Sequence, residues 1–280
     1  MNAAEALADG PLLIAHRGGS GLAPENTLAA FERAHRDWRA DMIELDVRAT
    51  ADDVCVVLHD ESLDRTTDGA GPVSRLRLAE LRALDAGCRF TPDGGRTFPF
   101  RGRGVRIPTL DEILEGLPGM VFTVEVKTGA AQKPLFDTIR RHGATARVIA
   151  AGMHDADRTL FADWDGPLSA SAEQIRAFIR LHALRLGRLR GPRADVVQVP
   201  ESHEGRRIVT PRFVRELAVH RVPVHVWTVD EVADMHRLLD WGVRGLITDW
   251  PDRLARVLHE RTGRALPPGA AHEPQTTTPT

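Results

Sequence analysis

The sequence has few of the features that mark disulfide-rich, nucleic-acid-binding or membrane-spanning proteins. It contains two cysteines, Cys55 and Cys88, which form no CxxC pair, and this excludes a zinc knuckle and a disulfide framework. Two free thiols in a reducing compartment are the simpler interpretation. The formal net charge is only -2, so the chain has no excess positive charge with which to bind nucleic acid. No apolar run approaches the ~18 residues of a membrane-spanning helix, and we expect no integral membrane segment.

The two ends of the chain also lack recognisable signals. The N-terminal segment has no basic region, and its apolar run at residues 12–15 is too short for a signal peptide. The default prediction is therefore a cytoplasmic location. Residues 261–280 are rich in Pro, Thr, Gly and Ala without apolar periodicity, which is typical of a disordered tail. Nothing in the pattern specifies an oligomeric state.

Between these ends, strand-like and helix-like segments alternate along a chain of 280 residues that is 42% hydrophobic and 27% charged. Such a chain suits a globular protein with one large domain or two small ones. The strand-like segments are 12–17, 42–47, 121–126, 147–151, 168–171, 196–199, 222–229 and 245–248, with 54–59 counted as an extension of the second. The helix-like segments are 27–38, 109–117, 133–141, 155–161, 173–186, 211–219, 231–241 and 251–260.

Eight strand–helix units predict a parallel sheet with helices outside it. The predicted fold is an α/β TIM (β/α)8 barrel, formed by a single domain at residues 1–260 with a small insertion after strand two at about residues 60–107. An open doubly wound sheet is the alternative. In a barrel of this kind the chemistry lies at the C-terminal ends of the strands. Polar residues that end a strand are therefore the candidates for a site.

Acidic side chains end two of the predicted strands. Glu44 and Asp46 are two residues apart, so both point to one face, and the same parity places Glu125 and Lys127 on the inner face of the next strand. Carboxylates held close together repel unless a positive charge lies between them. A divalent cation that prefers oxygen ligands, Mg²⁺ or Ca²⁺ and also Mn²⁺, fits this need. Salt bridges from the carboxylates to arginine, or from Lys127 to Glu125, are the alternatives.

Two histidines also follow apolar runs. His16 ends the first strand beside Arg17, and His59 ends the segment 54–59. Two histidines near a divalent cation, an arginine and a lysine suggest acid–base chemistry on a phosphate ester. His16 could instead be a structural histidine. Both could also be ligands of a transition metal, although neither His-x-His nor His-Glu-x-x-His occurs.

Nine short motifs follow one another along the chain. They are HRGG at 16–19, PENT at 24–27, ELDV at 44–47, HD at 59–60, LDRTTDG at 63–69, IPTL at 107–110, VEVK at 124–127, VWTV at 226–229 and GLITD at 245–249. In this order, from about residue 11 to 258, the set resembles the glycerophosphodiester phosphodiesterase family. The segment 151–154 departs from that family, which often has a Ser-Phe pair there.

The resemblance implies a TIM barrel with a small insertion after strand two. It also implies hydrolysis of deacylated phospholipids to glycerol 3-phosphate and an alcohol, with calcium or magnesium as the cofactor. A cyclic phosphate intermediate is expected. The resemblance assigns metal ligation to Glu44, Asp46 and Glu125, catalysis to His16 and His59, and phosphate contact to Arg17 and Lys127.

Three further residues each have two interpretations, and a fourth has one. Glu25 and Asn26 either belong to the site or begin a helix, with Asn26 as the N-cap. Trp227 ends a strand and either lines the substrate pocket or fills the barrel. Asp249 is expected to cap the last helix.

The insertion at 60–107 is predicted to form part of the substrate site, because it leaves the barrel at the catalytic face. Leu76, Leu78, Leu81 and Leu84 make a short helical stripe in it, and its phenylalanines and arginines would shield the pocket and attract an anion. A structural flap with its own small core is the alternative.

Three other functions remain open at this point. A lysophospholipase D would act on acylated substrates with the same residues, in a long apolar groove. A divalent-metal hydrolase of another ester is a further alternative. A non-catalytic phosphate-ligand binder would be expected to lack one of the carboxylates or histidines, yet all five are present.

Overall fold

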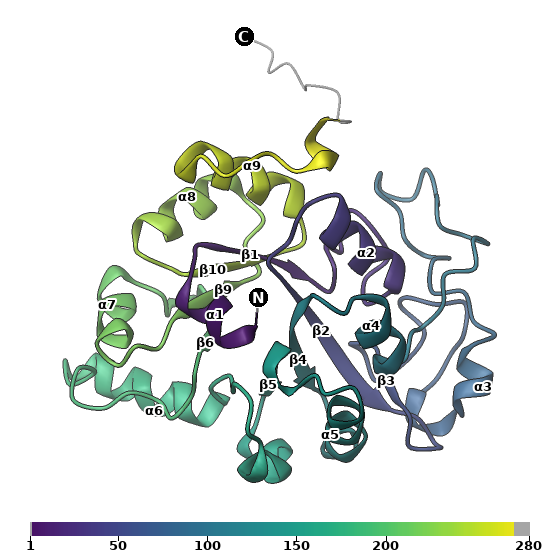
Figure 1. The fold of residues 1–280 in the computed structure, drawn as a ribbon, viewed down its shortest axis with the longest axis horizontal. Helices are drawn as coiled ribbons and strands as arrows, with labels where there is room; N and C mark the ends of the chain where they lie inside the picture. The colour runs from purple at the N-terminus through teal and green to yellow at the C-terminus, as the bar shows by residue number, and fades with distance from the viewer. Residues whose placement is uncertain (1, 272–280) are drawn as a thin grey trace.

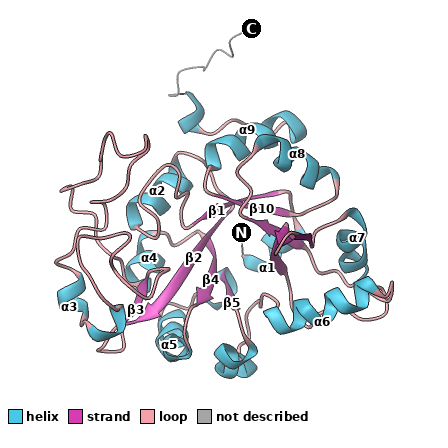
Figure 2. Cartoon of the chain, turned by 180° about the vertical axis from the view of Figure 1, so that it is seen from behind, coloured by secondary structure: helices cyan, strands magenta, loops and turns pink. Residues whose placement is uncertain are grey.

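The computed structural model describes residues 2–271, and its centre is a barrel of parallel strands surrounded by helices (Figures 1 and 2). Seven parallel strands are hydrogen-bonded in the order β5-β4-β2-β1-β10-β9-β6. Their bounds are β1 Leu12–His16, β2 Met42–Ala49, β4 Val121–Val126, β5 Val148–Gly152, β6 Val197–Pro200, β9 Val224–Trp227 and β10 Gly245–Thr248.

A short segment at residues 168–169 closes the barrel between β5 and β6. Leu168 forms a parallel bridge with Ala150 of β5, and Ser169 forms one with Val196, next to β6. The predicted eighth strand at 168–171 is thus present only as isolated bridges. The prediction of a TIM barrel is confirmed, and the doubly wound alternative is wrong.

Helices follow the strands on the outside of the barrel (Figure 1). The helix predicted at 109–117 begins with a capping box, in which the Thr109 hydroxyl accepts the Glu112 N–H at 3.2 Å and the Glu112 carboxylate accepts the Thr109 N–H at 2.8 Å. The segment predicted as a helix at 155–161 is a 3-10 helix, η4 (Asp155–Asp163). The outer α-helices are α2 Leu28–Arg36, α4 Leu110–Gly116, α5 Gln132–Arg141, α6 Ala172–Ala183, α7 Pro211–Val219, α8 Val232–Asp240 and α9 Pro251–Thr262.

A short N-terminal helix that the sequence analysis did not predict, α1 (Ala3–Ala8), closes one end of the barrel. Ala3 and Ala6 are buried in one apolar cluster with Leu12 and Ile14 of β1 and with inward residues of the other strands. Figure 1 shows α1 in front of the strands, near the barrel axis. Because α1 precedes β1, it covers the N-terminal ends of the strands and leaves their C-terminal ends open.

The insertion after β2 is a flap with its own small core. The segment before it, β3 (Cys55–Val57), pairs antiparallel with β2, so the prediction that 54–59 extends the second strand is wrong. Within the insertion, η1 (Val73–Arg75) and α3 (Leu78–Leu81) follow. Leu63, Val73, Leu81 and Ile107 are buried together in a separate apolar cluster. The alternative that the insertion is a structural flap with its own small core therefore accounts for most of its apolar residues.

The remaining elements are short. A two-stranded hairpin, β7 (Ser202–His203) with β8 (Arg206–Arg207), follows β6. The other 3-10 turns are η2 Gly129–Ala131, η3 Thr145–Arg147 and η5 Pro268–Ala271. Within the residues that the structure describes, no helix is long and apolar enough to cross a membrane.

The predicted disordered tail begins too early. Helix α9 continues to Thr262, the Arg264 guanidinium donates to the Asp41 carboxylate at 2.6 Å, and the Gly269 N–H donates to the Asp37 carbonyl at 2.8 Å. For residues 261–271 the prediction is therefore wrong, since backbone and ion-pair contacts anchor this segment to the barrel. The rest of the predicted tail, 272–280, lies outside the described residues.

Candidate active site

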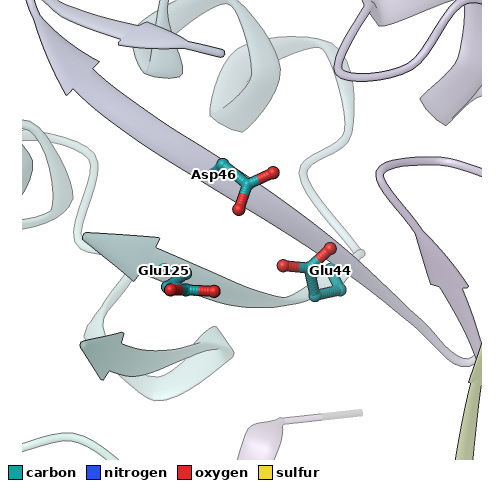
Figure 3. A group of neighbouring side chains, drawn as sticks. All are labelled: Glu44, Asp46 and Glu125. Carbon is teal, nitrogen blue, oxygen red and sulfur yellow. The ribbon is translucent and has the colours of Figure 1, made fainter. Parts of the chain in front are cut away.

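Three carboxylates meet on β2 and β4, where β2 lies beside the C-terminal ends of β1 and β4. Asp46 and Glu125 are direct partners in the parallel register, and Glu44 lies two residues before Asp46. One oxygen of each of the three carboxylates lies within 4.8 Å of the others. Figure 3 shows the three groups turned toward a common space. The parity argument thus placed Glu44, Asp46 and Glu125 together correctly.

Asp46 has positive partners. The Lys127 ammonium lies 2.9 Å from Asp46 Oδ1 and the Arg17 Nε lies 3.4 Å from its Oδ2, while the Asn26 amide donates to Oδ2 at 2.9 Å. Burial alone would raise the pKa of Asp46, but Lys127 and Arg17 outweigh it and lower that pKa. Lys127 also contacts Glu125 at 3.1 Å. Both ion pairs considered in the sequence analysis therefore exist.

Glu44 has much weaker compensation. It accepts the Arg17 backbone N–H at 3.2 Å, and its nearest cationic group among the described residues is the His16 ring, at 3.9 Å. Burial, together with the charges of Asp46 and Glu125, raises the pKa of Glu44 to about 8. The cluster therefore lacks positive charge at Glu44. An oxygen-liganded divalent cation held by Glu44, Asp46 and Glu125 fits that deficit.

The two histidines are each oriented by a carboxylate. His16 Nδ1 lies 2.6 Å from Asp249 Oδ1, and His59 Nδ1 lies 2.6 Å from Asp60 Oδ1. Because ionised carboxylates only accept hydrogen bonds, both rings carry their proton on Nδ1 when neutral. Burial would lower the pKa of His16, but the bond to Asp249 and the charge of Glu44 outweigh it and raise that pKa. In each ring Nε2 is left for chemistry.

Arginines connect these groups to the insertion. Arg17 donates to Glu25 at 2.8 Å. Arg65, from the insertion, donates to both oxygens of Glu25 at 2.6 and 2.8 Å and to Asp60 at 2.6 Å. Burial would raise the pKa of Glu25, but Arg65 and Arg17 lower it. One guanidinium therefore holds the carboxylate partners of both His59 and Arg17.

Asn26 does not begin the helix that follows it. Its φ is +56°, and Thr27 is the N-cap of α2, because the Thr27 hydroxyl accepts the Ala30 N–H. The cap interpretation of Asn26 is wrong. Its buried side chain instead binds Asp46 with its amide, and Glu25 binds two arginines, so both residues lie within the charged network.

The three carboxylates and two histidines, together with Arg17 and Lys127, line a pocket of about 460 Å³ at the open end of the barrel. Glu25 and Asn26 are not among its lining residues. Trp227 is 39% exposed at its rim, whereas His225, from the same strand, is fully buried and fills the barrel. The segment that departs from the family pattern contributes Met153 and His154 to the lining. The lining also includes apolar side chains, those of Met153, Ile175, Ile179, Ile208 and Trp227.

The insertion does not form a wall of this pocket. No described residue between 60 and 107 lines it. Phe90 packs edge-on against Phe100 with centroids 5.4 Å apart, and Arg101 stacks over Phe98 at 3.7 Å. The prediction that these aromatics and arginines shield the pocket is therefore wrong, because they pack on one another. The insertion reaches the site through Asp60, which binds His59, and through Arg65.

The sequence analysis missed the partners of the histidines. Asp249 was expected to cap α9, but Trp250 occupies the N-cap position and Asp249 binds His16. Asp230 holds this end of β10 by accepting the Thr248 hydroxyl at 3.0 Å and the Asp249 N–H at 2.9 Å. The motifs HD and GLITD contained the signal, but strand parity says nothing of residues beyond a strand end.

Comparisons with known proteins agree with this architecture. Residues 16–253 match the model of the glycerophosphoryl diester phosphodiesterase family. The chain belongs to this family. It is accordingly an enzyme, a phosphodiesterase.

Two relatives are named glycerophosphodiester phosphodiesterase. That of Caldanaerobacter subterraneus subsp. tengcongensis is 34% identical, with 89% of this chain and 98% of the relative covered. That of Bacillus subtilis is 30% identical, with 88% and 86% covered. Among solved structures, an Oleispira antarctica phosphodiesterase in complex with the product sn-glycerol-3-phosphate superposes with a TM-score of 0.71 at 24% identity, covering 90% of this chain and 98% of that one. At this level of identity, the likeness to the Oleispira antarctica structure shows a shared fold alone.

Proposed function

We propose that the protein hydrolyses glycerophosphodiesters to glycerol 3-phosphate and an alcohol, with a divalent cation at Glu44, Asp46 and Glu125 and with His16 and His59 as acid and base. The observation that carries the proposal is the geometry of the pocket. One buried carboxylate cluster short of positive charge lies beside two histidines, each fixed through Nδ1. The cation is Mg²⁺ or Ca²⁺, with Mn²⁺ as a further candidate, because all three ligands are oxygens.

The chain's own groups suffice to move the protons. One histidine Nε2 removes the proton of the glycerol hydroxyl next to the ester, and that oxygen bonds to phosphorus while the bond to the leaving alcohol breaks. The other histidine donates its Nε2 proton to the leaving oxygen. Water then opens the cyclic phosphate with the two roles reversed, which gives glycerol 3-phosphate.

The remaining charged groups bind the phosphate. Arg17 and Lys127 offer donors to the phosphoryl oxygens and stabilise the charge that develops there. When bound, the cation would neutralise charge on the phosphoryl oxygens and lower the pKa of the attacking hydroxyl. Trp227 borders the head-group or glycerol end of the pocket. Glu25 and Asn26 orient Arg17 and Asp46. The cytoplasmic location stays a prediction.

A lysophospholipase D activity is the second candidate, because part of the pocket lining is apolar. Met153, Ile175, Ile179 and Ile208 belong to this part. Such a lining can hold an acyl chain or an apolar head group, which a fully deacylated substrate does not have.

The test is a panel of glycerophosphodiesters and lysophospholipids assayed with Mg²⁺, Ca²⁺ or Mn²⁺ and with chelator. We expect chelation to abolish turnover, and His16→Ala and His59→Ala each to reduce kcat by about 10²–10⁴. A substrate with a good leaving group should partly rescue the variant that lacks the acid. Glu44→Gln and Glu125→Gln should each weaken metal binding, and Glu115→Gln, on the exposed face of α4, is their matched control.

Five outcomes would contradict the proposal. Full activity in excess chelator would refute the metal site. Near wild-type rates in both histidine variants would refute the acid–base roles. Loss of metal binding in both variants would instead make His16 and His59 metal ligands. Turnover of another ester alone would refute the substrate class. Binding of phosphate ligands without turnover would favour a non-catalytic barrel.

A further inference from the structure

The end of α6 and the loop after it carry exposed leucines among arginines. Leu184, Leu186 and Leu189 are 68%, 41% and 77% exposed. Five exposed arginines surround them, and the sequence has no acidic residue from 174 to 194. These arginines form no ion pair within residues 2–271. They are Arg180, Arg185, Arg188, Arg190 and Arg193, and together with the three leucines they are called the arginine–leucine surface below.

This surface is separate from the catalytic pocket. A hollow of about 530 Å³ lies under it, lined by Phe178, Leu181, Leu184 and Arg190 among others, and it shares no lining residue with the pocket. Helix α6 lies on the outside of the barrel (Figure 1). It turns Ile175 and Ile179 toward the catalytic pocket and Phe178 and Leu181 toward the hollow.

The loop is fixed to the body of the protein, so its leucines cannot fold inward. The Leu186 N–H donates to the Leu181 carbonyl at 2.8 Å, and the Gly187 carbonyl lies 2.8 Å from His220 Nε2 of the neighbouring helix end. Gly187 itself is so close to Glu216 that a Cβ would lie 2.2 Å from its carboxylate. The exposure of the leucines is thus a consequence of the backbone path.

We propose that the arginine–leucine surface binds a membrane surface that contains anionic lipids. Guanidinium groups pair with lipid phosphates through two parallel hydrogen bonds, and neighbouring leucines can enter the boundary between head groups and acyl chains. A large exposed apolar patch ringed by charge marks an interaction surface. The whole chain has a net charge of -2, so the five arginines form a local positive surface and are not part of a generally basic protein.

The same side chains fit nucleic acid poorly. Surfaces for single-stranded nucleic acid present aromatic rings on which bases stack, and the exposed apolar residues of the arginine–leucine surface are all leucine. Its one aromatic neighbour in the hollow, Phe178, is buried. The proposal is independent of the substrate of the catalytic pocket, because no residue of that pocket takes part.

The test is cosedimentation of the full chain with vesicles of phosphatidylcholine alone and with vesicles that also contain phosphatidylglycerol. We expect at least about tenfold tighter binding to the anionic vesicles, weakened by high salt. Two variants should each reduce this binding at least about tenfold. The first, Leu184→Ser with Leu189→Ser, removes apolar contact. The second, Arg188→Gln with Arg190→Gln and Arg193→Gln, removes charge.

Matched control variants distinguish an effect of the arginine–leucine surface from an effect of the total charge and hydrophobicity of the chain. Leu160→Ser with Leu266→Ser changes two leucines that are 45% and 44% exposed elsewhere. Arg96→Gln with Arg103→Gln and Arg106→Gln removes three exposed arginines from the insertion. Both controls should bind as the wild type does, and thermal unfolding should confirm that all variants are folded.

Two results would overturn the proposal. One is a lack of binding to anionic vesicles at low salt, or equal binding by the surface variants and the wild type. The other is a wild-type dimer, seen by light scattering, that the leucine variant abolishes while vesicle binding is absent. That outcome would assign the surface to a second copy of the chain.

Discussion

At the scale of single residues, the site depends on carboxylates that never need to touch substrate. Asp249 holds His16 and Asp60 holds His59, each at 2.6 Å through Nδ1. A carboxylate in that position fixes both the tautomer and the orientation of the ring. Its removal should therefore impair the chemical step more than substrate binding.

For Asp249→Asn we predict a fall in kcat of roughly 10- to 100-fold with KM little changed. This is less than the 10²–10⁴ expected for loss of a general acid or base itself. Steady-state kinetics on a glycerophosphodiester provide the measurement. Asp240→Asn is the control, because Asp240 is an exposed carboxylate that pairs only with Arg261 among the described residues. Equal rates for both variants would show that Asp249 does not position His16.

Strand parity predicted the residues inside the barrel but not their partners. Glu44, Asp46 and Glu125 could be placed on one face because side chains alternate along a strand. The contact between His16 and Asp249 joins residues 233 positions apart, and no local pattern encodes it. Asn26 likewise has a φ of +56°, and Thr27 is the N-cap of α2 in its place.

At the scale of elements, the insertion acts on the site through Asp60, at its start, and through Arg65, which holds Asp60 in place. Arg65 bridges Glu25 and Asp60, and so reaches Arg17 and His59 indirectly. Without Arg65, the charge of Glu25 would be balanced by Arg17 alone, which would leave Arg17 less free to bind phosphate. Asp60 would also lose the guanidinium that fixes its carboxylate.

We therefore predict that Arg65→Ala raises KM and lowers kcat together. The value of kcat/KM should fall about tenfold or more, which corresponds to a loss of about 1.4 kcal/mol in transition-state stabilisation. Arg65→Lys should be intermediate, because lysine keeps the charge but not the two-pronged geometry. The free energy of unfolding should change by less than about 1 kcal/mol, because the Arg65 side chain is 47% exposed. Arg82→Ala, in the same insertion and 44% exposed, is the control. Unchanged kinetics for Arg65→Ala would reduce the insertion to scaffold.

Elements with strong periodicity were predictable, and those that depend on distant contacts were not. The outer helices and seven of the strands lie close to their predicted positions. The strand at 168–171 is reduced to bridges, because only two of its residues pair with neighbours. Helix α1 is only six residues long and is stabilised by burial against the barrel floor rather than by its own pattern. Its capping box between Asn2 and Glu5 was the one local signal.

At the scale of the whole molecule, the barrel brings buried acidic groups together at a cost to stability. Burial and neighbouring charges raise the pKa of Glu44 to about 8, from an ordinary value of 4.5. The folded protein therefore binds a proton more tightly than the unfolded chain. By linkage, this contribution to stability is fully present below about pH 4.5 and is lost as pH rises toward and beyond 8.

The consequence can be measured on the metal-free protein by thermal unfolding in chelator between about pH 5 and pH 9. We predict that Glu44→Gln is more stable than the wild type at the alkaline end, by up to a few kcal/mol, because each pKa unit corresponds to about 1.4 kcal/mol. Near pH 5 the two should differ little. Added Mg²⁺ or Ca²⁺ should stabilise the wild type, because a ligand of the folded state raises the free energy of unfolding, and should stabilise Glu44→Gln much less. Glu115→Gln should follow the wild type at every pH. If Glu44→Gln were instead the less stable protein at alkaline pH in chelator, the ionised Glu44 would have a compensating partner, and the charge deficit that favours a cation at this site would not exist.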